Sequence, residues 1–282
     1  METWVYFTIL HAVFLAFFEA SKKKASEKNS IYEVLAFFSL IGFIITAIIT
    51  RDALAIDYRY MPMIFLKSSV VTVAWILGLT ALKQMEISLY SMVRISSIII
   101  TVILSSIFLG EVITVTSLIG MLIVITGLIL VNKTTTKEES KNSSLKVIFI
   151  LLLSCLFNSI SAIIDKKVLA YVNSGQLQFW FLLFLAVYFW LVLIIRRQKI
   201  DFSNLKKNYW IVLAAISIVT ADRLLFKANQ ITDSQVIIMT MLKQLSVIIS
   251  VILGKILFDE KNIIKKLLYS ILIICGIGVM FI

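Results

Sequence analysis

Small polar and cationic side chains recur at helical spacing inside a strongly apolar part of the chain. The first set is Ser91, Arg94, Ser97, Thr101 and Ser105, whose spacings of three and four residues place them on one face of an α-helix. Hydroxyl groups and a cation on one face are suited to binding an anionic group such as a phosphate or a carboxylate. We therefore interpret this face as one wall of a binding cavity.

A second set repeats the first one 149 residues later, at Thr240, Lys243, Ser246, Ser250 and Gly254. We predict that the two faces meet across one central cavity and that Arg94 and Lys243 receive the anionic group. The alternative is structural, because small residues let membrane helices pack closely and a long cationic side chain can reach back to the interface.

Other ionisable and polar side chains inside apolar segments are weaker candidates. A charge in a lipid-spanning helix costs about 2.5–3.5 kcal/mol unless a cavity, a partner or an interface is near. The further candidate ligands are Lys67, Trp75, Tyr90, Asn158, Asp222, Arg223, Lys227 and Gln244. An internal ion pair or a place near the interface would explain the charged members equally well, and aromatic residues also suit core or lipid-facing positions.

Two residues in the first apolar segment are candidates for coupling or gating. Glu19 is a carboxylate near its end, and His11 is the sole histidine of the chain. A histidine can relay protons, but a lone histidine in an apolar helix is also typical of a hydrogen-bonded packing residue.

The composition predicts that the solvent of this chain is a membrane. Of its 282 residues, 60% are hydrophobic and 15% are charged, and the mean hydropathy is +1.01. Soluble chains carry about 25% charged residues. The net charge of +11 is concentrated between apolar runs, where Lys and Arg meet headgroups and water, so we expect a lipid bilayer and no nucleic acid as partner. Cys155 and Cys275 fit no disulfide or metal-ligand pattern.

Ten apolar segments have lengths near the roughly 20 residues with which an α-helix crosses a bilayer. The runs are continuous and too long for the strands of a membrane barrel, so we predict an all-α fold. Lys22–Lys24 follow the first run, which is the reverse of the charge order in a cleavable signal peptide. The predicted spans are 3–20, 31–50, 61–82, 87–109, 112–131, 146–165, 176–195, 209–230, 234–257 and 263–282.

The two halves of the chain resemble each other. IIITVILSSIFLGE (98–111) aligns without gaps on VIISVILGKILFDE (247–260), and the alignment ends in two glutamates, Glu111 and Glu260. The hydrophilic segment 133–145 separates residues 1–132 from residues 146–282, which predicts five helices in each half. Because five is odd, the second half starts on the opposite side of the membrane, so the repeats are inverted. Inverted repeats are typical of transporters that expose a midplane site to each side in turn.

These segments resemble a known family. ALKQMEISLYSMVRISSIIITVILSSIFLGE (81–111), the span that ends in GLILV (127–131), and KQLSVIISVILGKILFDE (243–260) are similar to the EamA-type, ten-helix branch of the drug/metabolite transporter superfamily. The resemblance covers nearly the whole chain. It implies alternating access through a central cavity walled by helices of both halves, including the third, fourth, eighth and ninth.

Two details refine this resemblance. MTMLKQLSVIIS (239–250) is also similar to the ninth helix of sugar-phosphate/phosphate translocators, where a lysine at the place of Lys243 helps to bind phosphate. The arginine that follows it there is Gln244 here. In the fourth helix many EamA members carry a proline after a serine, whereas this chain has Ser96-Ser97-Ile98, so the helix distortion that the proline would cause is not expected.

The main functional prediction is a secondary active transporter, an exporter or exchanger, that moves a small anionic or zwitterionic metabolite across the cell (inner) membrane by alternating access. The alternatives keep the fold and change the cargo to an amino acid, an amphipathic drug-like compound or a lipid-linked anion. A membrane-embedded enzyme is remote, because the sequence has neither a nucleophile motif nor a metal-ligand cluster. It has no Gly-rich phosphate loop, so we expect ion or substrate gradients, and not ATP, to drive transport. We expect no cofactor, and a monomer or a homodimer.

The charges between the spans leave two orientations open. One predicted side holds Lys22–Lys24, the central linker, 196–207 and 261–266. It carries far more Lys and Arg than the other side, which holds Arg51, Arg59, Lys166 and Lys167. The positive-inside rule then places both termini outside. The resemblance implies cytoplasmic termini for many relatives.

Overall fold

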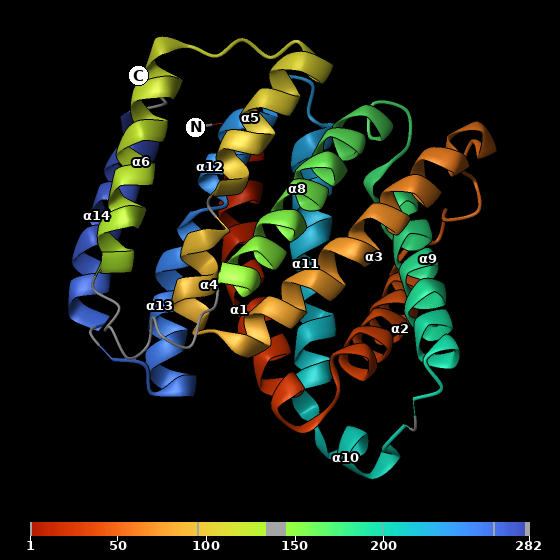
Figure 1. The fold of residues 1–282 in the computed structure, drawn as a ribbon. Helices are drawn as coiled ribbons and strands as arrows, with labels where there is room; N and C mark the ends of the chain where they lie inside the picture. The colour runs from red at the N-terminus through yellow and green to blue at the C-terminus, as the bar shows by residue number, and fades with distance from the viewer. Residues whose placement is uncertain (1, 95, 134–144, 199, 262, 280–282) are drawn as a thin grey trace.

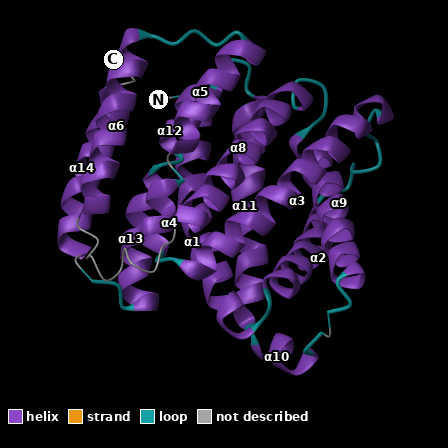
Figure 2. Cartoon of the chain, viewed as in Figure 1, coloured by secondary structure: helices purple, strands orange, loops and turns teal. Residues whose placement is uncertain are grey.

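A computed structural model describes residues 2–94, 96–133, 145–198, 200–261 and 263–279 (Figure 1). This part of the chain contains helices and no strand, as Figure 2 shows, so the predicted all-α fold is confirmed. Most of the predicted linker 133–145 lies outside the described residues. The helices are α1 Thr3–Lys28, α2 Ile31–Ile49, the 3-10 turn Tyr58–Tyr60, α3 Met61–Gln84, α4 Ile87–Val93, α5 Ser96–Leu109, α6 Val115–Lys133, α8 Leu145–Val168, α9 Ser174–Ile195, α10 Phe202–Lys207, α11 Tyr209–Gln230, α12 Val236–Leu242, α13 Leu245–Phe258 and α14 Ile263–Val279.

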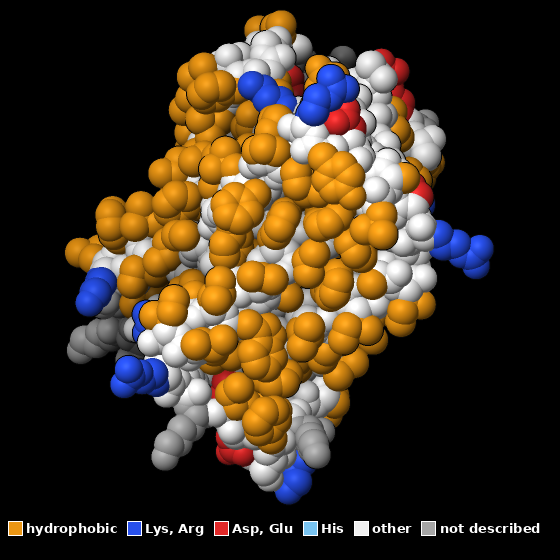
Figure 3. All heavy atoms as spheres, turned by 90° about the vertical axis from the view of Figure 1, so that its right-hand side faces the viewer, with side chains coloured by type: hydrophobic (Ala, Val, Ile, Leu, Met, Phe, Trp, Pro, Cys, Tyr) orange, Lys and Arg blue, Asp and Glu red, His pale blue; other side chains and the backbone are white. Residues whose placement is uncertain are grey.

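Seven helical segments of the described chain are long and apolar enough to cross a membrane, and Val115–Gly127 of α6 is a shorter apolar helix. The chain is therefore a multi-pass membrane protein, while the count of ten spans stays a prediction. Figure 3 shows one face of the molecule, where hydrophobic side chains form a broad band and charged side chains lie mainly at its edges. Such a band matches the hydrocarbon region of a bilayer.

The first helix is longer than predicted. α1 begins at Thr3, as expected, but continues to Lys28 instead of ending near residue 20. Lys22 is only 2% exposed and its Nζ lies 2.9 Å from Glu19, one helical turn earlier. The prediction that Lys22 lies in a headgroup-facing loop is wrong, because an i,i+3 ion pair keeps its charge inside the helical bundle.

Two predicted spans are each divided into two helices. Residues 87–109 form α4 and α5, and residues 234–257 form α12 and α13. The fourth predicted span is thus distorted although it lacks the proline, and the ninth predicted span is divided in the same way. Polar side chains bond to the backbone there: Ser96 Oγ donates to the Val93 carbonyl at 2.7 Å, and Gln244 Nε2 donates to the Thr240 carbonyl at 2.9 Å. Such bonds satisfy carbonyls that a broken helix leaves without an amide partner.

Helix packing follows the pattern of a two-fold repeat. α1 packs on α11 and α3 packs on α8, and these two pairs exchange when the halves are exchanged. The pairs α2 with α9, α6 with α14, and α4–α5 with α12–α13 each map onto themselves. The equivalent helices α2 and α9 even begin with the same device, a capping box, made by Ser30 with Glu33 and by Asn173 with Gln176. The predicted two-repeat architecture is confirmed.

Candidate functional site

A cavity of about 150 Å³ is lined by residues of both halves. Its walls come from α1, α3, α8, α9 and α11 and from the two broken helices. Ligand sites for drug-sized compounds measure about 300–1,000 Å³, so this volume favours a smaller ligand. The predicted site residues that line the cavity are His11, Glu19, Lys67, Trp75, Tyr90, Arg94, Ser97, Thr101, Asn158, Asp222, Thr240, Lys243, Gln244, Ser246 and Ser250.

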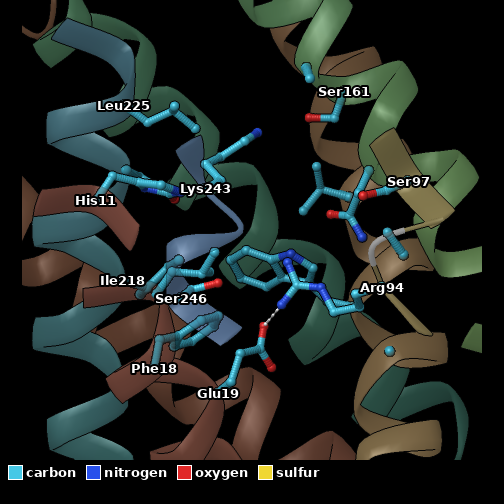
Figure 4. A pocket seen from close by; sticks show the side chains of 18 of the residues that line it. His11, Phe18, Glu19, Arg94, Ser97, Ser161, Ile218, Leu225, Lys243 and Ser246 are labelled. Carbon is cyan, nitrogen blue, oxygen red and sulfur yellow. Dashed lines mark hydrogen bonds and ion pairs between the residues drawn. The ribbon is translucent and has the colours of Figure 1, made fainter. Parts of the chain in front are cut away.

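The two predicted anchor cations occupy equivalent places, at the breaks of the two divided helices. Ser97 N donates to the Arg94 carbonyl at 3.0 Å, and Ser246 N donates to the Lys243 carbonyl at 3.1 Å. Both bonds join residues three apart, so the backbone is tighter there than in an α-helix. Figure 4 shows both side chains at the cavity. The offset of 149 residues in the sequence is therefore also a spatial correspondence.

Arg94 is committed to an ion pair inside the protein. Its Nη1 donates to Glu19 Oε1 at 2.8 Å (Figure 4), and the guanidinium carbon lies 5.6 Å from the centre of the Tyr90 ring. Glu19 also pairs with Lys22, so one buried carboxylate joins two cations. This arrangement is the internal ion pair that the structural alternative describes for buried charges.

Lys67 is also paired. Its Nζ lies 2.7 Å from Asp165 Oδ1 and 4.0 Å from the centre of the Phe181 ring. Asp165 lines the cavity and was missed by the sequence analysis, because it stands at the end of a predicted span beside Lys166. A carboxylate in the last turns of an apolar helix, the signal that identified Glu19, would have found it.

Lys243 differs from the other cavity cations. Among the residues that the structure describes, its Nζ has no carboxylate within 4.0 Å and no hydrogen bond. Figure 4 shows its side chain extending into the cavity. A buried ammonium keeps its charge only with compensating groups. Lys243 is therefore the cavity cation that an anionic group of a ligand can pair with.

Asp222, on α11, is the anionic counterpart of Lys243. It lines the cavity and is 9% exposed. In the described part of the chain, no hydrogen-bond donor and no cation within 4.0 Å meets its carboxylate. Asp222 and Lys243 nevertheless interact electrostatically across the cavity. The site thus contains two opposite charges that the protein leaves without a direct partner.

Two of the predicted ligands lie elsewhere. Arg223 donates to Gln178 Oε1 at 2.5 Å and to Thr50 Oγ1 at 2.7 Å, and Lys227 is exposed; neither lines the cavity. Successive residues of an α-helix point about 100° apart, so a helix that turns Asp222 inward turns Arg223 towards α9. The prediction that Arg223 and Lys227 face the cavity is wrong.

Several neutral polar residues of the cavity already have partners in the protein. His11 Nδ1 donates to the Ala221 carbonyl at 2.9 Å, Asn158 Nδ2 to the Ser154 carbonyl at 2.8 Å, and Thr101 Oγ1 to Ser159 Oγ at 2.9 Å. Trp75 stands in an aromatic cluster with Phe18 and Phe38. Ser105 and Gly254, the last members of the two polar faces, do not line the cavity. The polar faces thus serve helix packing as well as the cavity.

The paired glutamates cap helices of the opposite half. Glu111 accepts bonds from Val236 N at 2.7 Å and Ile237 N at 2.9 Å, at the start of α12. Glu260 accepts bonds from Ile87 N at 2.9 Å and Ser88 Oγ at 2.5 Å, at the start of α4. We call these contacts the Glu111 cap and the Glu260 cap. Residues 87 and 88 precede 236 and 237 by the same 149 residues, so the caps are crossed equivalents.

The caps lie at opposite ends of the bundle. In Figure 1 the start of α12 is near the upper end and the start of α4 near the lower end. The lower cap includes Lys266, whose Nζ donates to Ser88 Oγ at 2.8 Å and lies 3.5 Å from Glu260. At the upper end Lys166 Nζ donates to the Ser234 carbonyl at 2.8 Å. A carboxylate at a helix start is favourable because the first amides are unpaired and the helix dipole is positive there.

Comparisons with known proteins agree with this architecture. The model of the EamA-like transporter family matches residues 2–133 and 145–282. A solved structure, named only as a crystal structure of a protein, superposes with a TM-score of 0.71, covering 98% of this chain and 94% of that chain at 14% identity, which shows a shared fold. No curated protein matches the chain significantly. Because the family model covers both halves, the chain belongs to the EamA-like transporter family, a family of membrane transporters rather than enzymes.

Proposed function

We propose that this protein is a secondary active transporter of a small anionic or zwitterionic metabolite in the cell (inner) membrane, as an exporter or exchanger. The observation that carries the proposal is Lys243. Four cations line the cavity, and of these Lys22, Lys67 and Arg94 have a carboxylate partner within 4.0 Å among the described residues, while Lys243 has none. We assign to Lys243 the anionic group of the substrate.

The charge balance of the cavity supports an anionic group. Its lining holds four cationic side chains and three carboxylates, of Glu19, Asp165 and Asp222. With all of them ionised and His11 neutral, the cavity has a net positive charge. A cationic compound would meet this charge and leave Lys243 without a partner. An anionic group would compensate it, in surroundings where a direct contact is stronger than in water.

Arg94 has a supporting role in this proposal. It shares Glu19 with Lys22 and stacks near Tyr90, so it holds α1 against the break between α4 and α5. A second anionic contact through Arg94 would require Glu19 to release it. Arg94 and Lys243 occupy equivalent positions of the repeat, but in this proposal Arg94 stabilises the fold and Lys243 binds the substrate.

The crossed caps suggest how the two sides open. We propose that each cap closes one end of the bundle, and that the Glu111 cap and the Glu260 cap separate alternately as the halves rock against each other. Both caps join a helix end of one half to a helix start of the other, so rocking must strain them. Interfaces of this kind are bistable rather than continuously deformable.

The test begins with ligand binding by the full-length protein purified in detergent. Thermal unfolding is measured with sugar phosphates, organic acids, amino acids, amines and drug-like cations. Ligands of the native state raise the melting temperature by mass action. We expect stabilisation by compounds with an anionic group, lost in Lys243→Gln and retained in Lys227→Gln, a matched change at an exposed lysine outside the cavity.

Transport is then measured with the best compound in proteoliposomes. Uptake or exchange that fails in Lys243→Gln and persists in Lys227→Gln would support the proposal. Stabilisation by neutral or cationic compounds alone, unchanged in Lys243→Gln, would contradict it.

A further inference from the structure

We propose that Asp222 is a second pole of the site, which receives the positively charged group of a zwitterionic substrate while Lys243 holds its anionic group. This inference rests on the proposed function and narrows it from anions in general to molecules with both charges. It assigns a binding role to the one cavity carboxylate that has no ion pair among the described residues.

The Asp222 carboxylate has no compensating partner in the described chain. It is nine-tenths buried, lines the cavity and meets no donor within hydrogen-bonding distance in the described chain. Burying an ionised carboxylate without a donor is costly, and natural sites compensate it by a charge or by hydrogen bonds. Glu19 and Asp165 obtain this compensation from cations of the protein, and Asp222 does not.

Charged and polar groups from neighbouring helices surround Asp222. Lys67 from α3, Asp165 from α8 and Lys243 from the break between α12 and α13 interact with it electrostatically, and His11 from α1 bonds to the carbonyl of the preceding Ala221. Lys67 is held by Asp165 at 2.7 Å and is not free to move to Asp222. On α9, Gln178 bonds to the Val219 carbonyl and to Arg223. None of these groups donates a hydrogen bond to the Asp222 carboxylate in the described chain.

Ligands of different charge would compensate Lys243 and Asp222 to different extents. A monoanion on Lys243 leaves Asp222 without a partner, and a second negative charge would meet Asp222, Asp165 and Glu19. An amine on Asp222 leaves Lys243 without a partner. A zwitterion satisfies both groups, and each new contact is charge-assisted. The restricted volume of about 150 Å³ favours a compact molecule of this class.

The experiment uses matched probes on the full-length protein. Each set contains a zwitterion, its analogue without the amino group and its analogue without the carboxylate: alanine, propanoate and ethylamine; leucine, 4-methylpentanoate and 3-methylbutylamine; 4-aminobutyrate, butanoate and propylamine. Thermal-shift titrations at pH 7 give the half-saturating concentration of each. In at least one set we expect the zwitterion to bind about ten- to hundredfold more tightly than either analogue, as for a hydrogen bond to a charged group.

Variants then test which charged group of the ligand binds to Asp222 and which binds to Lys243. Asp222→Asn should abolish the advantage of the zwitterion over the monoanion, and Lys243→Gln should abolish its advantage over the amine. Asp233→Asn is the matched control, because Asp233 is exposed and does not line the cavity. Melting temperatures without ligand show that each variant is folded.

The possible failures are distinguishable. If monoanions bind as tightly as zwitterions and need Lys243 but not Asp222, the second pole is wrong and the proposed function stands. If Asp222→Asn keeps the zwitterion preference but loses substrate-driven proton movement in proteoliposomes, Asp222 binds the coupling proton instead. If no probe of the three sets binds while sugar phosphates or other organic acids bind and need Lys243, this inference is contradicted and the proposed function stands. If Lys243→Gln changes no ligand's binding, both the proposed function and this inference are contradicted.

Discussion

The breaks of the two divided helices are equivalent in sequence and in space, yet their cations differ. At the α4–α5 break, Arg94 is bound to Glu19 and lies over Tyr90. At the α12–α13 break, Lys243 meets no carboxylate within 4.0 Å in the described chain and extends into the cavity. One half of a duplicated site thus has its charge compensated internally. Equivalent positions in the two halves therefore do not have the same role.

The strongest challenge to this comparison is removal of the carboxylate on the paired side. Glu19→Ala leaves Arg94 and Lys22 without their shared partner, and removal of one member of a buried ion pair costs about 3–5 kcal/mol. We expect a large fall in the free energy of unfolding, measured by denaturant titration in detergent. Glu27→Ala serves as the control, because Glu27 pairs with Lys24 at the exposed end of the same helix. A similar, small effect of both substitutions would contradict the structural role of Glu19.

The ion pair between α3 and α8 should show a comparable effect, somewhat smaller because one cation is involved rather than two. Lys67→Met removes the partner that lies 2.7 Å from Asp165, and we expect a loss near the lower end of the about 3–5 kcal/mol range. The double variant Lys67→Met/Asp165→Leu should recover much of this stability, since no charge is then left unpaired. A double variant no more stable than Lys67→Met would contradict the explanation that the unpaired Asp165 charge causes the loss.

The Glu111 cap and the Glu260 cap are equivalent contacts that we expect to behave alike. Their removal should cost less stability than loss of a buried ion pair. Glu111→Gln and Glu260→Gln each remove a negative charge from a helix start, and loss of a helix cap costs about 0.5–2 kcal/mol. Hydrogen exchange followed by mass spectrometry should become faster at Val236 and Ile237 in the first variant, and at Ile87 in the second. Faster exchange at both ends in both variants would indicate that the caps do not act separately.

The sequence predicted the repeat, the paired glutamates and most of the polar side chains that line the cavity, because each is visible in the types and spacing of the residues. The matched ends at Glu111 and Glu260 were visible, but the amides that they cap, at Val236 and Ile87, are distant in sequence. The assignment of Arg223 to the cavity failed because an apolar helix does not reveal how it is rotated about its axis. Neighbouring positions 222 and 223 differ in role through packing alone.

Ion pairing was the other property that sequence spacing did not determine. Lys22 and Asp165 stand near the ends of apolar runs, where charges usually reach the headgroups. Both are buried here because each finds an opposite charge inside the bundle, Lys22 in its own helix and Asp165 on α3. Likewise Arg94 and Lys243 looked interchangeable until their partners were known.

We propose that Lys243, and not the paired cations, binds the anionic group of the substrate. The most direct test is the melting temperature of Lys243→Gln, with and without the anionic or zwitterionic compound that most stabilises the wild type. Since no ion pair is broken, we predict a ligand-free melting temperature within about 2 °C of the wild type, which corresponds to less than about 1 kcal/mol for a chain of this size. We also predict that the ligand-induced shift disappears. A ligand-induced shift that persists in Lys243→Gln, or a loss of stability as large as that of Glu19→Ala, would contradict the assignment of the substrate's anionic group to Lys243.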